Sequence, residues 1–79
     1  MEKSLAVVAI IVTDFDAVER VNALLSEYRD YVVGRMGLPH RDGKNVISVV
    51  LEASNEIVNS LSGKLGMVKG VKSKVLIAK

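Results

Sequence analysis

The sequence predicts a single α+β domain, residues 1–79, with the element order β-α-β-β-α-β. An apolar run rich in β-branched residues opens the chain at residues 5–12. Two later segments carry apolar residues at helical spacing, and two strand-like runs between them flank an Asp42-Gly43 turn dipeptide. These periods predict strands and one-sided helices in that order. A chain of 79 residues also has the length of one domain.

The first strand is expected at residues 5–12, where apolar residues occupy both alternating faces. This pattern is typical of a strand that is covered on both sides. Asp16 and Glu19 have the spacing of a capping box, which predicts that the first helix begins at Asp16. The helix presents one apolar stripe to the sheet. Its members are Val18, Val21, Leu24, Leu25 and Tyr28.

The next two strands are expected at residues 31–38 and 46–53, joined as a hairpin by a turn at residues 39–44. Gly34 and Gly37 lie inside the earlier strand. A glycine in a strand usually marks a bulge or a close backbone approach.

A second helix and a last strand complete the chain. Ser54 is a good N-cap for this helix, and Gly66 is its expected C-cap. Gly63 in the last turn costs about 1 kcal/mol relative to Ala, so we expect a packing or backbone-access reason for it. The last strand is expected at residues 71–78. The apolar stripe of the helix consists of Ile57, Val58, Leu61 and Leu65.

Right-handed crossovers place both helices on one face of a four-stranded antiparallel sheet, which is the ferredoxin-like arrangement. The other face then lacks a cover, although the first strand is apolar on both faces. The chain is 49% hydrophobic and has no cysteine to crosslink it. Because small apolar chains of this kind usually oligomerise, we expect a homo-oligomer, a dimer or a tetramer. The expected interface residues are Val46, Ser48 and Val50.

Charge does not indicate a nucleic-acid partner, since the net charge is only +2. Five lysines and no acidic residue follow Glu56. An anionic partner is one interpretation, but solvated lysines that partly guard an edge strand are favoured. Direct nucleic-acid binding is therefore not expected.

No segment has the length of a transmembrane helix. Residues 5–12 are too short for a signal peptide, and Asp14 and Asp16 stand where a cleavage site would be needed. We expect a cytoplasmic protein with no membrane partner.

Enzymatic and metal chemistry find no support in the sequence. No serine has a clear base partner beyond His40, and His40 alone cannot hold a metal. For His40 an ordinary turn position is favoured over a ligand or a pH switch. The aromatic residues Phe15, Tyr28 and Tyr31 lack the strand-centre pattern of RNA-recognition domains. We expect no catalytic residue, no cofactor and no metal.

Several short segments, in their order and spacing, resemble one known family. They are residues 34–39 (Gly-Arg-Met-Gly-Leu-Pro), 61–66 (Leu-Ser-Gly-Lys-Leu-Gly), 22–28, 46–50, Asn59 and 70–73. Over nearly its whole length the chain is similar to the small ACT-like regulators of the iron-only hydrogenase system. The resemblance implies an ACT-like fold related to the C-terminal domain of nickel-responsive regulators, a homo-oligomer and a regulatory role. A direct repressor role is not expected from the resemblance, and a partner protein is one way in which contact with DNA could be made.

An effector site is expected around the central glycine-containing segment, because glycines let backbone N–H groups approach a ligand closely. Arg35 can hold a carboxylate or a phosphate with two hydrogen bonds. The other interpretation is that these glycines serve turns and close packing, with Arg35 solvated. The candidate residues are Gly34, Arg35, Met36, Gly37, Pro39, Arg41, Gly63 and Lys64.

Three functions remain open at this point. The first is an oligomeric regulatory module that binds a small effector. The second is a structural or adaptor protein that binds a partner protein through its open sheet face. The third is nucleic-acid binding through the C-terminal lysines. The sequence ranks them in that order.

Overall fold

The structure is a computed structural model that describes residues 3–78, apart from the side chain of His40. Its elements follow the predicted order, with one 3-10 turn before the first helix and another after it. They are β1 (Ser4–Val12), η1 (Phe15–Ala17), α1 (Val18–Glu27), η2 (Arg29–Tyr31), β2 (Val32–Arg41), β3 (Lys44–Ala53), α2 (Asn55–Gly66) and β4 (Val71–Ile77).

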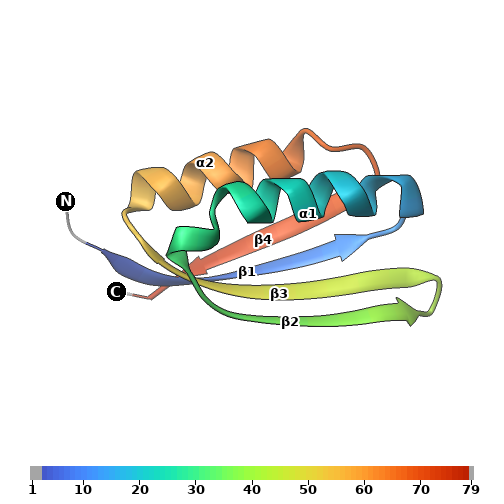
Figure 1. The fold of residues 1–79 in the computed structure, drawn as a ribbon, viewed down its shortest axis with the longest axis horizontal. Helices are drawn as coiled ribbons and strands as arrows, with labels where there is room; N and C mark the ends of the chain where they lie inside the picture. Colours follow the sequence, from blue (N-terminus) through green and yellow to red (C-terminus); the bar gives the residue numbers. More distant parts are fainter. Residues whose placement is uncertain (1–2, 79) are drawn as a thin grey trace.

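The four strands form one antiparallel sheet in the order β2-β3-β1-β4. Both helices lie on the same face of this sheet, so the molecule has two layers (Figure 1). In the middle of the sheet, Val8 of β1 lies opposite Val49 of β3 and Val75 of β4. The ferredoxin-like βαββαβ fold predicted from the sequence is confirmed.

The core lies between the sheet and the helices. Alternate residues of β1 point toward the helices and are buried, as the two-residue period of a strand requires. The apolar stripes predicted for both helices are confirmed, although Val18 and Ile57 are only partly buried. The largest fully buried side chains are Ile10, Leu24, Leu51, Leu61, Leu65, Val8, Val12, Val21, Val49 and Val58.

The predicted start of the first helix at Asp16 is wrong. The Asp14 carboxylate accepts a hydrogen bond of 3.0 Å from the backbone N–H of Asp16 and caps the 3-10 turn η1. Because this turn comes first, α1 begins at Val18, and its N-cap Ala17 makes no side-chain bond. No capping box with Glu19 is therefore formed.

The hairpin turn is shorter than predicted. It consists of Asp42 and Gly43 alone, and both have positive φ angles, 54° and 71°. Such a two-residue turn matches the twist of the flanking strands. Pro39, expected in the turn, lies instead in β2, an edge strand that tolerates a missing N–H. The bulge expected at the glycines is confirmed next to Gly34, where the register with β3 shifts.

The end of α2 also differs from the prediction. Ser54 is the N-cap as predicted, accepting from the backbone N–H of Ile57 at 3.4 Å. Gly66, however, is the last helical residue, and the C-cap is Met67. An added Cβ on Gly63 would meet nothing within 4 Å, so the packing reason expected for this glycine is wrong.

A close contact joins the turn before β4 to the turn after β1. Gly70 has a φ of 83°, and a Cβ added there would lie 2.5 Å from the Cβ of Asp14. The Gly70 carbonyl accepts hydrogen bonds from the backbone N–H of Thr13 at 2.8 Å and from its hydroxyl at 3.1 Å. Glycine is required here both by backbone angle and by space.

Candidate functional site

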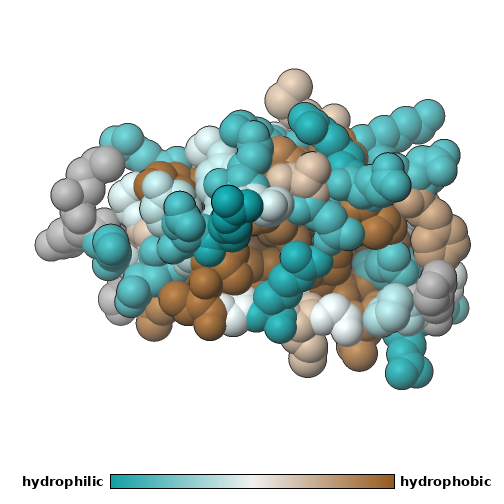
Figure 2. Space-filling view, in the orientation of Figure 1, coloured by the Kyte–Doolittle hydropathy of each residue, from teal (hydrophilic) through white to brown (hydrophobic). Residues whose placement is uncertain are grey.

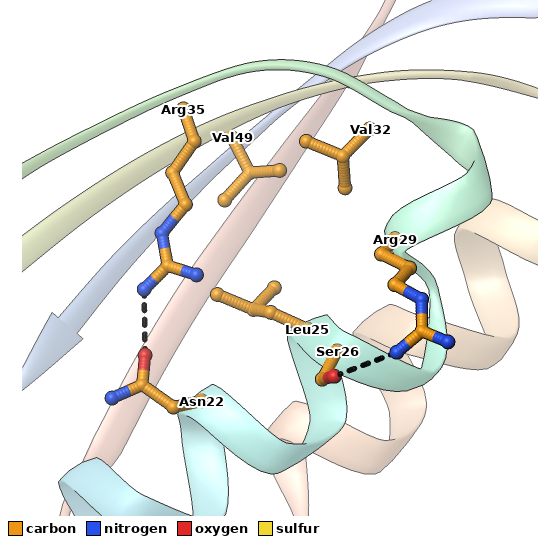
Figure 3. Close-up of a pocket in the computed structure, with 7 residues that line it drawn as sticks. All are labelled: Asn22, Leu25, Ser26, Arg29, Val32, Arg35 and Val49. Atoms are coloured by element: carbon orange, nitrogen blue, oxygen red, sulfur yellow. Dashed lines mark hydrogen bonds between the residues drawn. The ribbon is translucent and has the colours of Figure 1, made fainter.

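A groove lies between α1 and the edge strand β2 (Figure 3). It remains because two helices do not fully cover a four-stranded sheet at its β2 edge. Its volume is about 340 Å³, at the lower end of the range for small-molecule sites. Its lining residues are Asn22, Leu25, Ser26, Arg29, Val32, Arg35 and Val49.

Hydrogen-bond donors occupy both ends of this α1–β2 groove. At one end, Nη2 of Arg35 donates to Oδ1 of Asn22 at 2.6 Å. At the other, Nη1 of Arg29 donates to Oγ of Ser26 at 3.5 Å, the long limit of a hydrogen bond. Within residues 3–78, neither guanidinium pairs with a carboxylate. Two positive charges therefore face this groove without an acidic partner.

The floor of the groove is apolar. Leu25 and Val49 are buried, and Val32 is half-buried. Figure 3 shows these three side chains between the Arg35–Asn22 pair and the Arg29–Ser26 pair. The groove thus combines an apolar middle with two polar, positively charged ends.

The sheet face opposite the helices carries a second candidate surface, which we call the open face. Its large apolar side chains come from three strands, and they are exposed by 38–72%. Brown hydrophobic atoms reach the lower margin of the molecule, which is the sheet side (Figure 2). These exposed residues are Leu5, Val7, Ile11, Met36, Leu38 and Leu76.

The centre of the open face is flat because its side chains are small. Ser48 of β3 lies opposite Ala9 of β1, and Gly34 of β2 lies opposite Val50. Lys72 and Lys74 of β4 pair with Ile11 and Ala9 of β1 and add basic groups to this face. A contiguous apolar area of this kind usually marks an interaction surface.

A third feature is a hollow of about 560 Å³ that lies beside α2 and next to the C-terminal end of α1. The hydroxyl groups of Tyr28 and Ser60 share a hydrogen bond of 2.8 Å. The Lys64 ammonium lies 5.2 Å from the centre of the Tyr28 ring and 3.7 Å from Oε2 of Glu27. The Tyr28 hydroxyl, as a hydrogen-bond partner, and the Glu27 carboxylate raise the pKa of Lys64. These contacts join the two helices.

The structure does not gather the predicted effector residues into one site. Arg35 lines the groove, but Met36 points to the opposite side of the sheet. Arg41 lies at the hairpin end, opposite Lys44. Lys64 lines the separate hollow beside α2. The remaining predicted residues, outside both hollows, are Gly34, Gly37, Pro39 and Gly63.

Sequence reasoning missed the helical half of the groove. Asn22, Ser26 and Arg29 follow one another at spacings of four and three residues, which is the repeat of one helix face, although the structure places Arg29 in η2, just after α1. This polar stripe beside the apolar one was the available signal. The predicted interface residues Val46, Ser48 and Val50 lie half-buried on the open face, and their role in assembly stays a prediction.

Among residues 3–78, the side chains that the structure describes form no group of three or more His, Cys, Asp or Glu that could hold a metal ion. The side chain of His40 lies outside the description. In the same part of the chain, no helix is long and apolar enough to cross a membrane.

Comparison with known proteins identifies the family. The model of the family described as "TM1266-like: Iron-only hydrogenase system regulator, putative" matches residues 4–75. The chain belongs to this family. The resemblance stated from the sequence is therefore confirmed, and the description of the family is that of a regulator of the iron-only hydrogenase system.

Solved structures extend this result. The TM1266 protein of Thermotoga maritima is 34% identical, with a TM-score of 0.93, and the match covers 99% of this chain and 100% of that one. The C-terminal domain of the MgtC protein from Mycobacterium tuberculosis is 15% identical, with a TM-score of 0.76 over 96% of this chain and 88% of that one. A formyltetrahydrofolate deformylase from Pseudomonas putida KT2440 is also 15% identical, with a TM-score of 0.63 over 90% of this chain and 28% of that one.

The last two similarities show a shared fold alone. A comparison with curated proteins gives no match.

Proposed function

We propose that this member of the iron-only hydrogenase regulator family is an oligomeric module that binds a small effector. The observation that carries the proposal is the open face, an apolar surface that spans the sheet on the side without helices. A second copy of the same chain is the simplest cover for it. The effector would change the assembly or the partner contacts of the module.

The size of the open face fits self-association. The molecule measures 38 × 20 × 18 Å, and Figure 1, which looks down the shortest axis, shows the helix and sheet layers stacked vertically. The sheet layer therefore extends over at most 38 by 18 Å, or just under 700 Å². Stable interfaces bury about 800 Å² on each partner. A second copy that covers this face would therefore bury nearly the area on each partner that a stable dimer requires.

Edge-to-edge pairing through β2 fits less well. β2 carries Pro39 and two register shifts with β3, and both features disturb a flat edge. Face-to-face packing avoids these obstacles, and the small Ser48 and Ala9 at the centre allow two sheets to approach closely.

Native mass spectrometry tests the assembly. We expect the wild-type chain to give a dimer or a tetramer. Val7→Lys places a charge in the middle of the open face, and we expect it to weaken association at least tenfold. Met67→Lys also replaces an apolar residue by lysine, at a site that is 87% exposed and outside the strands, and it should leave the assembly intact. A wild-type monomer at tens of micromolar would contradict self-association.

A thermal-shift panel of amino acids, nucleotides and metal ions tests the effector. A ligand that binds only the folded state raises the melting temperature by mass action. If no compound produced a shift, the effector half of the proposal would be abandoned.

An adaptor protein is the second candidate, because the open face could equally receive a partner protein. A hetero-complex captured by wild-type and Met67→Lys protein but not by Val7→Lys protein would favour it. If the wild-type chain recovers only itself, self-association is favoured.

A further inference from the structure

The α1–β2 groove differs from an ordinary surface hollow in its charge. Arg29 and Arg35 line it from opposite walls, one from η2, just after α1, and one from β2 (Figure 3). Surface arginines commonly pair with nearby carboxylates, but in the part of the chain that the structure describes these two do not. The groove therefore lacks the negative charge that would balance it.

The neighbouring polar groups are arranged as donors. Asn22 Oδ1 already accepts from Arg35, so the amide NH2 group of Asn22 remains as a further donor at that end. Ser26 Oγ faces Arg29, which leaves the hydroxyl hydrogen to be donated. Each end of the groove thus offers one guanidinium and one neutral donor. Such a set recognises an acceptor group with negative charge, such as a carboxylate.

The space between the two ends has a different character. Leu25, Val32 and Val49 form an apolar floor, and none of them offers a side-chain donor or acceptor. A purely polar ligand would lose hydration over this floor without gaining a partner. A short hydrocarbon chain would instead bury apolar surface there.

We infer that the groove binds a small aliphatic dicarboxylate, with one carboxylate at Arg35 and Asn22 and the other at Arg29 and Ser26. This inference rests on the proposed effector-binding function and names the chemical class of the effector. The volume of about 340 Å³ suits a compact molecule rather than a nucleotide. The guanidinium fork of each arginine matches the two oxygens of a carboxylate.

Binding of α,ω-dicarboxylates of increasing chain length, measured by calorimetry and by amide NMR shifts, tests the inference. We expect one chain length to bind best, with shifts at residues that line the groove. The monocarboxylate of the same length should bind at least tenfold more weakly, because one charge-assisted pair is lost. Inorganic phosphate, which cannot reach both ends, should also bind more weakly. Raising the salt concentration should weaken all of these interactions.

Charge variants assign the site. Arg29→Gln and Arg35→Gln should each reduce dicarboxylate affinity at least tenfold. Arg20→Gln, an exposed position on α1 outside the groove, removes the same charge and should not change affinity. All three residues are exposed, so the variants should fold, and amide spectra would verify this.

The outcomes separate the inference from the proposed function. If no dicarboxylate binds, or if binding is the same in Arg29→Gln, Arg35→Gln and Arg20→Gln, the groove assignment is wrong. A different effector that still raises the melting temperature of Arg29→Gln and Arg35→Gln would then leave the regulatory module standing. Weak binding that does not depend on chain length would mean charge attraction without a shaped site, and it would also overturn the inference.

Discussion

The contact between Gly70 and Asp14 gives the sharpest stability prediction. A Cβ placed on Gly70 would lie 2.5 Å from the Cβ of Asp14, a separation that real Cβ atoms do not adopt. Gly70→Ala also places an L residue at a φ of 83°, which costs roughly 1–2 kcal/mol. Relief of the overlap by shifting the two turns adds roughly 1–3 kcal/mol. We expect a total loss of roughly 2–5 kcal/mol in the free energy of unfolding.

Two other glycines provide matched controls. Gly43 has a φ of 71° but nothing within 4 Å of an added Cβ, so Gly43→Ala should lose only the backbone term of roughly 1–2 kcal/mol. Gly63 lies in α2 and also faces open space. Gly63→Ala should therefore increase stability by roughly 0.5–1 kcal/mol, the helix-propensity difference.

Thermal unfolding at one fixed protein concentration measures the series, since association makes the melting temperature depend on concentration. For a domain of this size, 1 kcal/mol corresponds to roughly 4–8 °C. We expect the highest melting temperature for Gly63→Ala, followed in descending order by wild type, Gly43→Ala and Gly70→Ala.

One result would refute the reasoning about the close contact. If Gly70→Ala were no less stable than Gly43→Ala, the two turns would be able to move apart at no cost. The overlap with Asp14 would then not contribute to the loss of stability. The variant Asp14→Gly supplies an internal check, because it lacks the Cβ that causes the overlap. In that background Gly70→Ala should lose only the backbone term. An unchanged loss would place the cause elsewhere.

Two further predictions concern the contacts between the helices. Tyr28→Phe removes the 2.8 Å hydrogen bond to Ser60 and should cost roughly 0.5–1.5 kcal/mol, and a double-mutant cycle with Ser60→Ala should show coupling of that size. The pKa of Lys64 should exceed its ordinary value of 10.5 in an NMR titration and should fall toward that value in Tyr28→Phe. Because folding raises the pKa of Lys64, the charged Lys64 side chain contributes to stability below pH 10.5. This contribution is lost as the pH rises through the pKa of the folded state. A Lys64 titration identical in both proteins would contradict this assignment.

The spacing of apolar residues along the chain predicted the strands and helices of this fold well. The alternation along residues 5–12 and the stripes of both helices depend on the burial of one face, and burial is what the sequence pattern records. Element boundaries were harder, because they depend on competition between local bonds. The spacing to Glu19 favoured Asp16 as the cap, whereas in the structure Asp14 caps the 3-10 turn η1 that precedes the helix. Pro39 likewise signals a turn until β2 is known to lie at the sheet edge.

The candidate site was predicted only in part for a different reason. Arg35 stood out because of its glycine neighbours, but the groove depends on the placement of α1 over the β2 edge. Asn22 belongs to that helix and lies 13 residues before Arg35, and Arg29 lies in the 3-10 turn η2 that follows it. Their proximity is a tertiary fact that no local pattern records. The open face was easier to predict, since a strand that is apolar on both sides requires two covers.

The alternation of side chains along β2 has a consequence for regulation. Arg35 projects into the groove, whereas the next residue, Met36, projects onto the open face. The same short segment of backbone therefore carries a residue of each proposed binding surface. A ligand that displaces this segment at the groove must also displace the surface on the other side. Thermodynamic reciprocity then requires that association of chains alter ligand affinity by the same factor by which the ligand alters association. Ligand affinity in such a protein would change with protein concentration.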